Sequence, residues 1–131
     1  MSVDAEIVRR AHAALNSGDL DALLELCDPG FRLDMSDRVM NPAVYDGHEG
    51  IRRFYDEVHE VWQAYTWEPR RILESGDRLV AQLHSTGRGR GSGVEIVRET
   101  AMVWTVGAGR ATSVRFYRDP GEALRASGLS D

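Results

Sequence analysis

Two residues that could carry acid/base chemistry, His84 and Glu99, lie on either side of a short glycine-containing turn. If the chain turns tightly around Gly91 and Ser92, positions 84 and 99 come opposite each other on neighbouring strands. Side chains paired in this way have Cβ atoms about 4.5–5.5 Å apart. A carboxylate at that distance orients an imidazole and favours its charged form. The spacing predicts a catalytic pair, a contact that polarises a ligand, or a purely structural pair.

The other histidines and the single cysteine form no recognisable site. His48 and His59 flank an expected helix without the spacing of metal ligands, and HEG at 48–50 is not the HExxH zinc motif. Cys27 falls on an apolar helical stripe, so we expect it to pack as a small hydrophobic residue. The glycine-rich segment 87–93 lacks the strand-to-helix context of a phosphate-binding loop. The sequence therefore predicts no metal site and no cofactor.

The elements that must position these residues begin with a helical hairpin. Apolar residues recur at helical spacing over 7–15, and Gly18 is expected to end this helix. Asp19 is expected to cap a second, short helix that ends before Gly30. A third helix is expected to start near His48. Its inward face is expected to consist of Ile51, Phe54, Tyr55, Val58 and Trp62.

Strand patterns dominate the rest of the chain. Residues 31–35 alternate apolar and charged side chains, whereas 36–47 are expected to form an irregular loop. After Trp62, three glycine-containing turns separate four strand-like segments, which indicates an antiparallel meander. Pro69 interrupts the first segment and predicts an edge strand or a bulge. A short helix within 119–128 follows, so the chain is expected to form one α+β domain over its whole length, with a cone-shaped hollow between sheet and helices.

Five segments carry a resemblance to a known superfamily: AALNSGDLDALLELCDP, YDGHEGIRRFYDEV, GRGRGSGVEI, MVWTVGAGR and FYRDPGEALRASGL. In these segments and their order, the chain resembles the superfamily of ketosteroid isomerases, SnoaL-like polyketide cyclases and nuclear-transport-factor-2-like domains. The resemblance implies a cystatin-like, ketosteroid isomerase-like cone. About three N-terminal helices would pack on the concave face of a strongly curved antiparallel sheet, followed by a short C-terminal helix. It implies little about activity, because the superfamily holds enzymes, binding modules and dimerisation domains.

The functional residues of the ketosteroid isomerases can be compared with this sequence position by position. The resemblance puts Ala11 where the family has a tyrosine, Met35 where it has an aspartate and Ala101 where it has a second acid. Because none of these side chains can move a proton, we expect no ketosteroid isomerase activity. Asp34 is one residue from the base position, but a slip that turned it inward would turn the apolar residues of 31–35 outward.

The same resemblance implies which side chains line the hollow. On two neighbouring strands the inward residues are expected to be Val80, Gln82, His84, Thr86, Val97, Glu99, Ala101 and Val103. His84 and Glu99 are accordingly the expected catalytic pair. The expected ligand-binding residues are Gln82, Tyr45, Tyr55, Trp62, Met35 and Val103. Helical spacing favours a core position for Tyr55 and Trp62 as the alternative.

The outer face of the sheet is expected to form an interface between two copies of the chain. The residues expected on this face are Met102, Trp104, Arg115 and Tyr117. An exposed apolar patch of this composition indicates a two-fold homodimer.

Composition narrows the range of partners and compartments. A net charge of −5, with the basic residues interleaved among acids, argues against nucleic-acid binding. No stretch approaches the roughly 20 apolar residues of a membrane span, and no signal peptide is recognisable. A single cysteine rules out an intramolecular disulfide and favours a reducing compartment, so we expect a cytoplasmic protein.

Three functions follow as alternatives. The first is a cofactor-independent enzyme, such as an isomerase, cyclase, hydrolase or dehydratase, that acts on a hydrophobic polyketide- or terpenoid-like compound by acid/base chemistry. The second is a binding module that holds such a ligand without converting it. The third is a dimeric scaffold whose hollow is filled by its own side chains. The sequence favours the first two and does not separate them.

Overall fold

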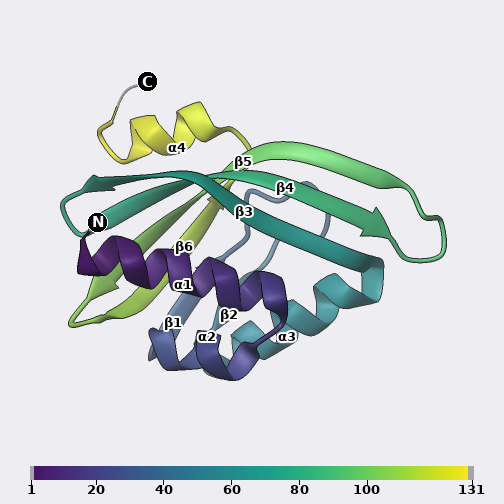
Figure 1. Cartoon of the computed structure of the whole chain (residues 1–131), viewed down its shortest axis with the longest axis horizontal. Helices are drawn as coiled ribbons and strands as arrows, with labels where there is room; N and C mark the ends of the chain where they lie inside the picture. The colour runs from purple at the N-terminus through teal and green to yellow at the C-terminus, as the bar shows by residue number, and fades with distance from the viewer. Residues whose placement is uncertain (1, 130–131) are drawn as a thin grey trace.

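Helices cover both faces of a curved sheet (Figure 1). The computed structural model describes residues 2–129. The helices α1 (Val3–Ser17), α2 (Leu20–Leu26) and α3 (Gly47–Val61) lie on the concave face. The short helix α4 (Pro120–Ala126) lies on the opposite, convex face. The predicted α+β architecture is confirmed.

The sheet has the strand order β2-β1-β6-β5-β4-β3. Its strands are β1 (Cys27–Asp34), β2 (Val44–Asp46), β3 (Trp62–Ser75), β4 (Arg78–Gly89), β5 (Glu95–Gly107) and β6 (Arg110–Tyr117). The strands β3 to β6 form the predicted antiparallel meander, and β1 joins it through a parallel pairing with β6. The short β2 lies within the segment predicted to be an irregular loop. Three residues are too few for strand periodicity to show in the sequence.

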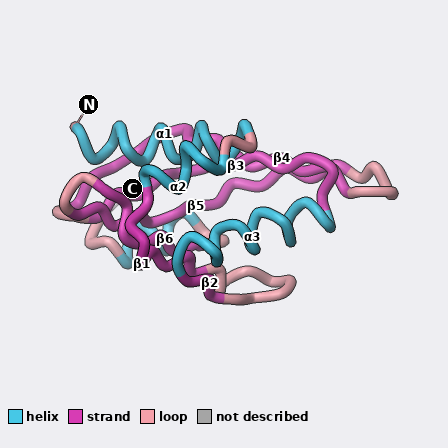
Figure 2. The backbone as a smooth tube through the Cα atoms, turned by 90° about the horizontal axis from the view of Figure 1, so that it is seen from below, coloured by secondary structure: helices cyan, strands magenta, loops and turns pink. Residues whose placement is uncertain are grey.

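Capping residues set the helix boundaries. Gly18 has a φ of 77°, and this left-handed conformation ends α1. The Asp19 side chain then accepts a hydrogen bond of 3.2 Å from the backbone N–H of Ala22 and begins α2. Both predictions are confirmed. Figure 2 shows the three N-terminal helices along one side of the sheet, with the loop that joins β1 to β2 beside α3.

The edge strand β3 is held against α1 by one asparagine. The side chain of Asn16 donates to the carbonyl of Trp67 at 3.1 Å and accepts from the N–H of Trp67 at 2.8 Å. The pairing of β3 with β4 shifts between Pro69 and Arg71, so the predicted irregularity at the proline is confirmed. These contacts fix the part of β3 that carries Trp67 into the core.

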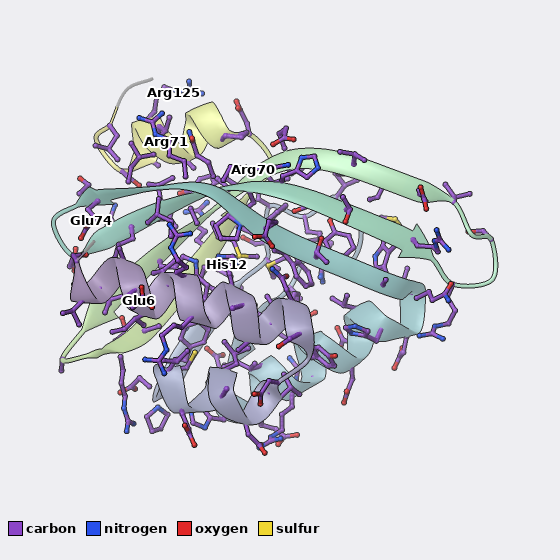
Figure 3. The ribbon with its side chains drawn as sticks, viewed as in Figure 1. Glu6, His12, Arg70, Arg71, Glu74 and Arg125 are labelled. Atoms are coloured by element: carbon purple, nitrogen blue, oxygen red, sulfur yellow. The ribbon has the colours of Figure 1, made fainter. Side chains whose placement is uncertain are left out.

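The main core lies between α1 to α3 and the inner face of the sheet. From β4 and β5 it receives Leu79, Ala81, Leu83, Met102, Trp104 and Val106. His12 of α1 is fully buried against this face (Figure 3) and accepts a hydrogen bond of 3.1 Å from the indole N–H of Trp104. Burial lowers the pKa of His12 to about 4, so this histidine is neutral in the folded protein near pH 7.

A second, smaller core lies on the outer face beneath α4. It contains Val80, Ala101, Val103, Tyr117, Ala123 and Leu124. Because side chains alternate along a strand, Gln82, His84, Thr86, Val97 and Glu99 also lie on this outer face. The prediction that these side chains belong to the inner face is wrong, because the inner and outer faces of β4 and β5 are exchanged relative to it. Where α4 covers the convex face, at Val80, Ala101 and Val103, β4 and β5 are apolar on both faces, so the apolar pattern there does not distinguish inside from outside.

The residues predicted to form a dimer patch do not share a face. Met102 and Trp104 are 1% and 3% exposed and belong to the main core, so placing them on an exposed outer face is wrong. Tyr117 is covered by α4, and Arg115 is exposed. The cause is the same as for the hollow: the residues of β5 predicted to face outward face inward, and the reverse. Homodimerisation itself stays a prediction.

Candidate functional site

A hollow of about 560 Å³ lies between α3, the loop that joins β1 to β2, and the inner face of β3 and β5. Val39 and Met40 of the loop and Val61 of α3 border it and are 70%, 68% and 47% exposed. The hollow therefore opens to the surface at this end. Its volume lies within the range of about 300–1,000 Å³ that is typical of small-molecule pockets.

Aromatic rings form much of the wall. The ring of Tyr65 lies 5.3 Å from that of Trp62 and 4.6 Å from that of Trp67, and all three residues line the hollow. Tyr65 packs closely over Gly87 of β4, where a Cβ atom would come within 2.7 Å of its ring. A glycine at this position lets the tyrosine lie against the backbone of β4. Met35 and Phe116 add further apolar surface.

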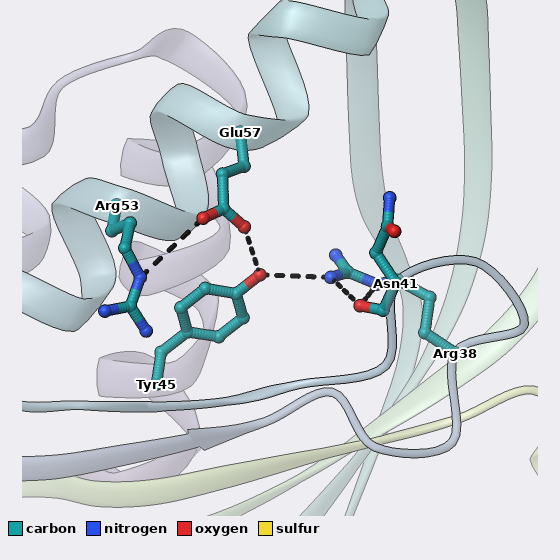
Figure 4. Close-up of polar contacts among 5 residues, drawn as sticks. All are labelled: Arg38, Asn41, Tyr45, Arg53 and Glu57. Carbon is teal, nitrogen blue, oxygen red and sulfur yellow. Dashed lines mark hydrogen bonds and ion pairs between the residues drawn. The ribbon is translucent and has the colours of Figure 1, made fainter.

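A chain of hydrogen bonds links Tyr45, one of the predicted ligand-binding residues, to the loop and to α3 (Figure 4). The hydroxyl of Tyr45 donates to Oε1 of Glu57 at 2.6 Å and accepts from Arg38 at 3.0 Å. Arg38 also donates to the backbone carbonyl of Asn41 at 2.5 Å, and Arg53 lies 3.7 Å from the other oxygen of Glu57. Burial and the bond to Glu57 raise the pKa of Tyr45, so its hydroxyl stays protonated. The network fixes Arg38 and Glu57 at the border of the hollow.

Arginines predominate among the charged residues that line the hollow. Arg38, Arg98 and Arg118 are the basic residues there. Arg118 lies 3.7 Å from Asp37, and Arg38 donates to uncharged oxygens only. Among residues 2–129, the guanidinium of Arg98 has neither an ion-pair nor a hydrogen-bond partner. The hollow thus holds positive charge that the described carboxylates do not neutralise.

Two hydroxyls lie near this charge. Thr100 is 4% exposed and lines the hollow, and its Oγ1 has no hydrogen-bond partner among the described residues. Burial raises the pKa of Tyr65, and the charges of Arg98 and Arg38 oppose that rise. Both guanidiniums therefore lie close enough to the Tyr65 phenol to act on it. Leaving a buried hydroxyl unpaired costs about 1–3 kcal/mol, which a polar group of a ligand would recover.

The predicted pairing of His84 with Glu99 is confirmed. The two residues are cross-strand partners, and Nδ1 of His84 lies 2.5 Å from Oε1 of Glu99. The pair is on the outer face, with side chains 28% and 62% exposed, although Glu99 also borders the hollow. The catalytic role of the pair stays a prediction, and a substrate in contact with His84 would lie on the outer face.

The predicted ligand-binding residues are distributed between the hollow and other parts of the fold. Met35 and Trp62 line the hollow. Tyr45 is 1% exposed and meets the lining residue Glu57 through its hydroxyl. Asp34, the neighbour of Met35, turns away and lies 4.0 Å from Arg115.

The remaining predicted ligand-binding residues lie outside the hollow. Tyr55 stacks on His59 within α3, with ring centroids 4.1 Å apart. Gln82 and Val103 lie on the outer face, Val103 beneath α4. For these two, the cause is the exchange of the inner and outer faces of β4 and β5. For Tyr55, the alternative of packing within the protein describes its position.

Sequence patterns did not reveal Arg38, Glu57, Arg98 or Thr100. Arg38 lies in an irregular loop, where no periodicity assigns a direction to a side chain. Arg98 and Thr100 alternate with Glu99 and Ala101, so the opposite choice of face for β5 would have selected both. Glu57 shares a helix with several exposed charged residues, and only the tertiary contact to Tyr45 sets it apart.

The described residues also bear on metal binding and cysteine chemistry. In the segment 2–129, no three side chains of histidine, cysteine, aspartate or glutamate come together as a metal site requires. Cys27 is fully buried, and burial raises the pKa of its thiol to about 12. It packs in the core as predicted, but as the first residue of β1 rather than on a helix, because α2 ends at Leu26. None of the described helices combines the length and apolar character needed to cross a membrane.

The curved sheet, its helical layer and the hollow between them define a ketosteroid isomerase-like cone. Residues 8–114 match the model of the SnoaL-like domain, and the chain therefore belongs to the SnoaL-like domain family. Among curated proteins, none matches the sequence.

Several solved structures share the fold. TerC, crystallised with polyporic acid, has a TM-score of 0.81 and 21% identity, over 97% of this chain and 99% of TerC. A ketosteroid isomerase-like protein from Catenulispora acidiphila, in complex with trimethylamine, has a TM-score of 0.77 and 19% identity, over 95% and 93% of the two chains. A putative SnoaL-like polyketide cyclase from Shewanella denitrificans has a TM-score of 0.77 and 15% identity, over 91% and 92%. At these identities the similarity shows the fold alone.

Proposed function

We propose that the protein binds a hydrophobic small molecule in the hollow between α3 and the sheet. The observation that carries this proposal is an open hollow of about 560 Å³ whose wall is largely aromatic and apolar. Rings at this wall, such as Trp62, Tyr65 and Trp67, offer flat apolar surface to a ligand. A few polar groups converge on the same space, as in small-molecule sites generally. A self-filled scaffold is the poorer description, because the hollow stays open.

The ligand class we propose is a polyketide- or terpenoid-like compound. Family membership supports this class, as do two structural neighbours: TerC was crystallised with polyporic acid, and another is a putative SnoaL-like polyketide cyclase. The volume of the hollow and its aromatic wall also suit compounds of this class.

A second candidate function is cofactor-independent acid/base catalysis in the same hollow. The observation that favours it is the carboxylate of Glu57, which borders the hollow and is held by Tyr45 and Arg53. A carboxylate fixed in this way can accept a proton from a bound ligand. Glu57 would be the catalytic residue and Tyr45 a positioning residue. A ligand converted by the wild-type protein but only bound by Glu57→Gln would establish this function.

Binding in the hollow is tested with N-phenyl-1-naphthylamine, an uncharged probe whose fluorescence rises in apolar surroundings. Ile96 lines the hollow, so Ile96→Trp fills part of it and should weaken probe binding at least tenfold. Val97 is the next residue on β5, is 64% exposed and faces the other side. Val97→Trp is therefore the matched control and should leave probe binding unchanged. Equal effects of the two substitutions, or no probe binding by the wild-type protein, would overturn the proposal.

We also propose a cytoplasmic homodimer. The only cysteine is buried, which suits a reducing compartment. The outer face beside Gln82 and His84 leaves the apolar side chain of Val97 uncovered in the single chain. Light scattering on the purified protein measures the molar mass directly, and the mass of one chain would overturn the dimer.

A further inference from the structure

Positive charge is in excess among the residues that line the hollow. Its carboxylates already have basic partners, since Glu57 lies 3.7 Å from Arg53 and Glu99 contacts His84. Arg98 reaches the hollow from the inner face of β5 without a partner among residues 2–129. Arg98 is exposed, and its unpaired guanidinium can attract an anionic group that enters the hollow from solvent.

The buried hydroxyl of Thr100 is a second, independent observation. Thr100 lies two residues from Arg98 on β5, so the two side chains point to the same face. Thr100 lines the hollow, and its buried Oγ1 has no hydrogen-bond partner among the described residues. A hydroxyl in this state can donate to an oxygen atom of a ligand. Arg98 and Thr100 therefore lie on the same wall of the hollow.

Arg38 completes this set of donors from the opposite side. It belongs to the loop that joins β1 to β2, and its Cζ lies 5.9 Å from the ring centroid of Phe54. Its bonds to Asn41 and Tyr45 hold it in place without neutralising its charge. An acidic group between Arg38 and Arg98 would gain two charge-assisted interactions, and Thr100 would add a third contact.

We propose that the ligand of the hollow is an organic acid, whose carboxylate binds to Arg98 and Arg38 with Thr100 as a further donor. This inference rests on the proposed function, because it assigns a chemical class to the ligand of the same hollow. The hydrophobic body of the acid lies against the aromatic wall formed by Trp62, Tyr65 and Trp67. A cationic ligand is disfavoured, because Glu57 and Glu99 each contact a basic side chain already, Arg53 and His84.

The test compares two probes of nearly the same size and shape, one an anion and one uncharged. Displacement of N-phenyl-1-naphthylamine by 2-naphthoate and by 2-naphthamide gives the affinity of the wild-type protein for an acid and for its neutral analogue. We expect 2-naphthoate to bind at least tenfold more tightly, and added salt to weaken the acid but not the amide. Equal affinities would overturn the organic-acid inference and leave the proposed function intact. Failure of all three probes would overturn both.

Variants locate the preference in the hollow. Arg98→Gln should reduce the preference for 2-naphthoate several-fold, because Arg38 remains, while the affinity for 2-naphthamide stays within twofold. Thr100→Val should reduce the preference by about threefold to tenfold. Arg110 is exposed at the turn between β5 and β6, away from the hollow lining, so Arg110→Gln is the matched control for the lost charge. An unchanged preference in Arg98→Gln, or an equal loss in Arg110→Gln, would show that Arg98 does not bind the carboxylate in the hollow. Either result would overturn the inference.

Discussion

The hydroxyl of Tyr45 lies between two charged residues, donating to Glu57 at 2.6 Å and accepting from Arg38 at 3.0 Å. Tyr45→Phe keeps the buried ring and removes both hydrogen bonds. Because these bonds involve charged partners in a partly buried place, we expect the free energy of unfolding to fall by about 1–2 kcal/mol. Urea denaturation followed by circular dichroism measures this change.

Tyr65→Phe is the matched control for this substitution. Among residues 2–129 the hydroxyl of Tyr65 makes no hydrogen bond, although its ring packs on Trp62 and Trp67. Removing that hydroxyl should change the free energy of unfolding by less than about 0.5 kcal/mol. If both substitutions cost the same, the stabilising role of the Tyr45 network is refuted.

The pair formed by His84 and Glu99 should be separable from binding in the hollow. His84→Ala is expected to leave the affinity for N-phenyl-1-naphthylamine within twofold, because the imidazole lies on the outer face. The loss in stability should stay below about 1 kcal/mol, since the Glu99 side chain is 62% exposed and the ion pair is accessible to water. Fluorescence titration of His84→Ala and Glu99→Gln checks both expectations. A tenfold loss of affinity in His84→Ala would show that the pair contributes to ligand binding and would contradict this prediction.

The order of elements could be predicted because each local signal has a short-range cause. Gly18 ends a helix through its positive φ, Asp19 caps the next one, and Pro69 marks a break in strand pairing. The pairing of His84 with Glu99 likewise depends only on the turn between their strands. None of these features requires knowledge of what covers the sheet.

The inside and outside of the sheet could not be predicted in the same way. Leu79, Val80 and Ala81 are consecutive buried residues, so β4 shows no apolar alternation at this point. The outer members of such a run are covered by α4, which comes nearly 40 residues later in the sequence. The candidate site depends on this choice, because it decides whether Thr100 or Ala101 faces the hollow.

Gly50 lies where α3 crosses β2, and its lack of a side chain is required there. A Cβ at position 50 would lie 2.9 Å from the backbone carbonyl carbon of Tyr45. Alanine normally favours a helix over glycine by about 1 kcal/mol, but here overpacking against the backbone costs about 1–3 kcal/mol. We expect Gly50→Ala to be destabilising in thermal denaturation. Gly121→Ala in α4 is the control, because its Cβ would first meet the flexible Arg125 side chain, and it should be neutral or stabilising. A more stable Gly50→Ala protein would contradict the close approach of α3 to β2.

His12 should make the stability of the protein fall as the pH is lowered. Burial lowers its pKa from the ordinary value of 6.5 to about 4, so between these pH values the unfolded chain binds a proton that the folded chain does not. The free energy of unfolding then decreases by about 1.4 kcal/mol per pH unit, to a total of about 3 kcal/mol, and above pH 6.5 the contribution is constant. His12→Gln retains an acceptor for the indole N–H of Trp104 but does not titrate, so its stability should depend less steeply on pH in this interval. Urea midpoints of both proteins across the interval measure the difference, and parallel profiles would show that His12 is protonated as readily in the folded protein as in the unfolded chain.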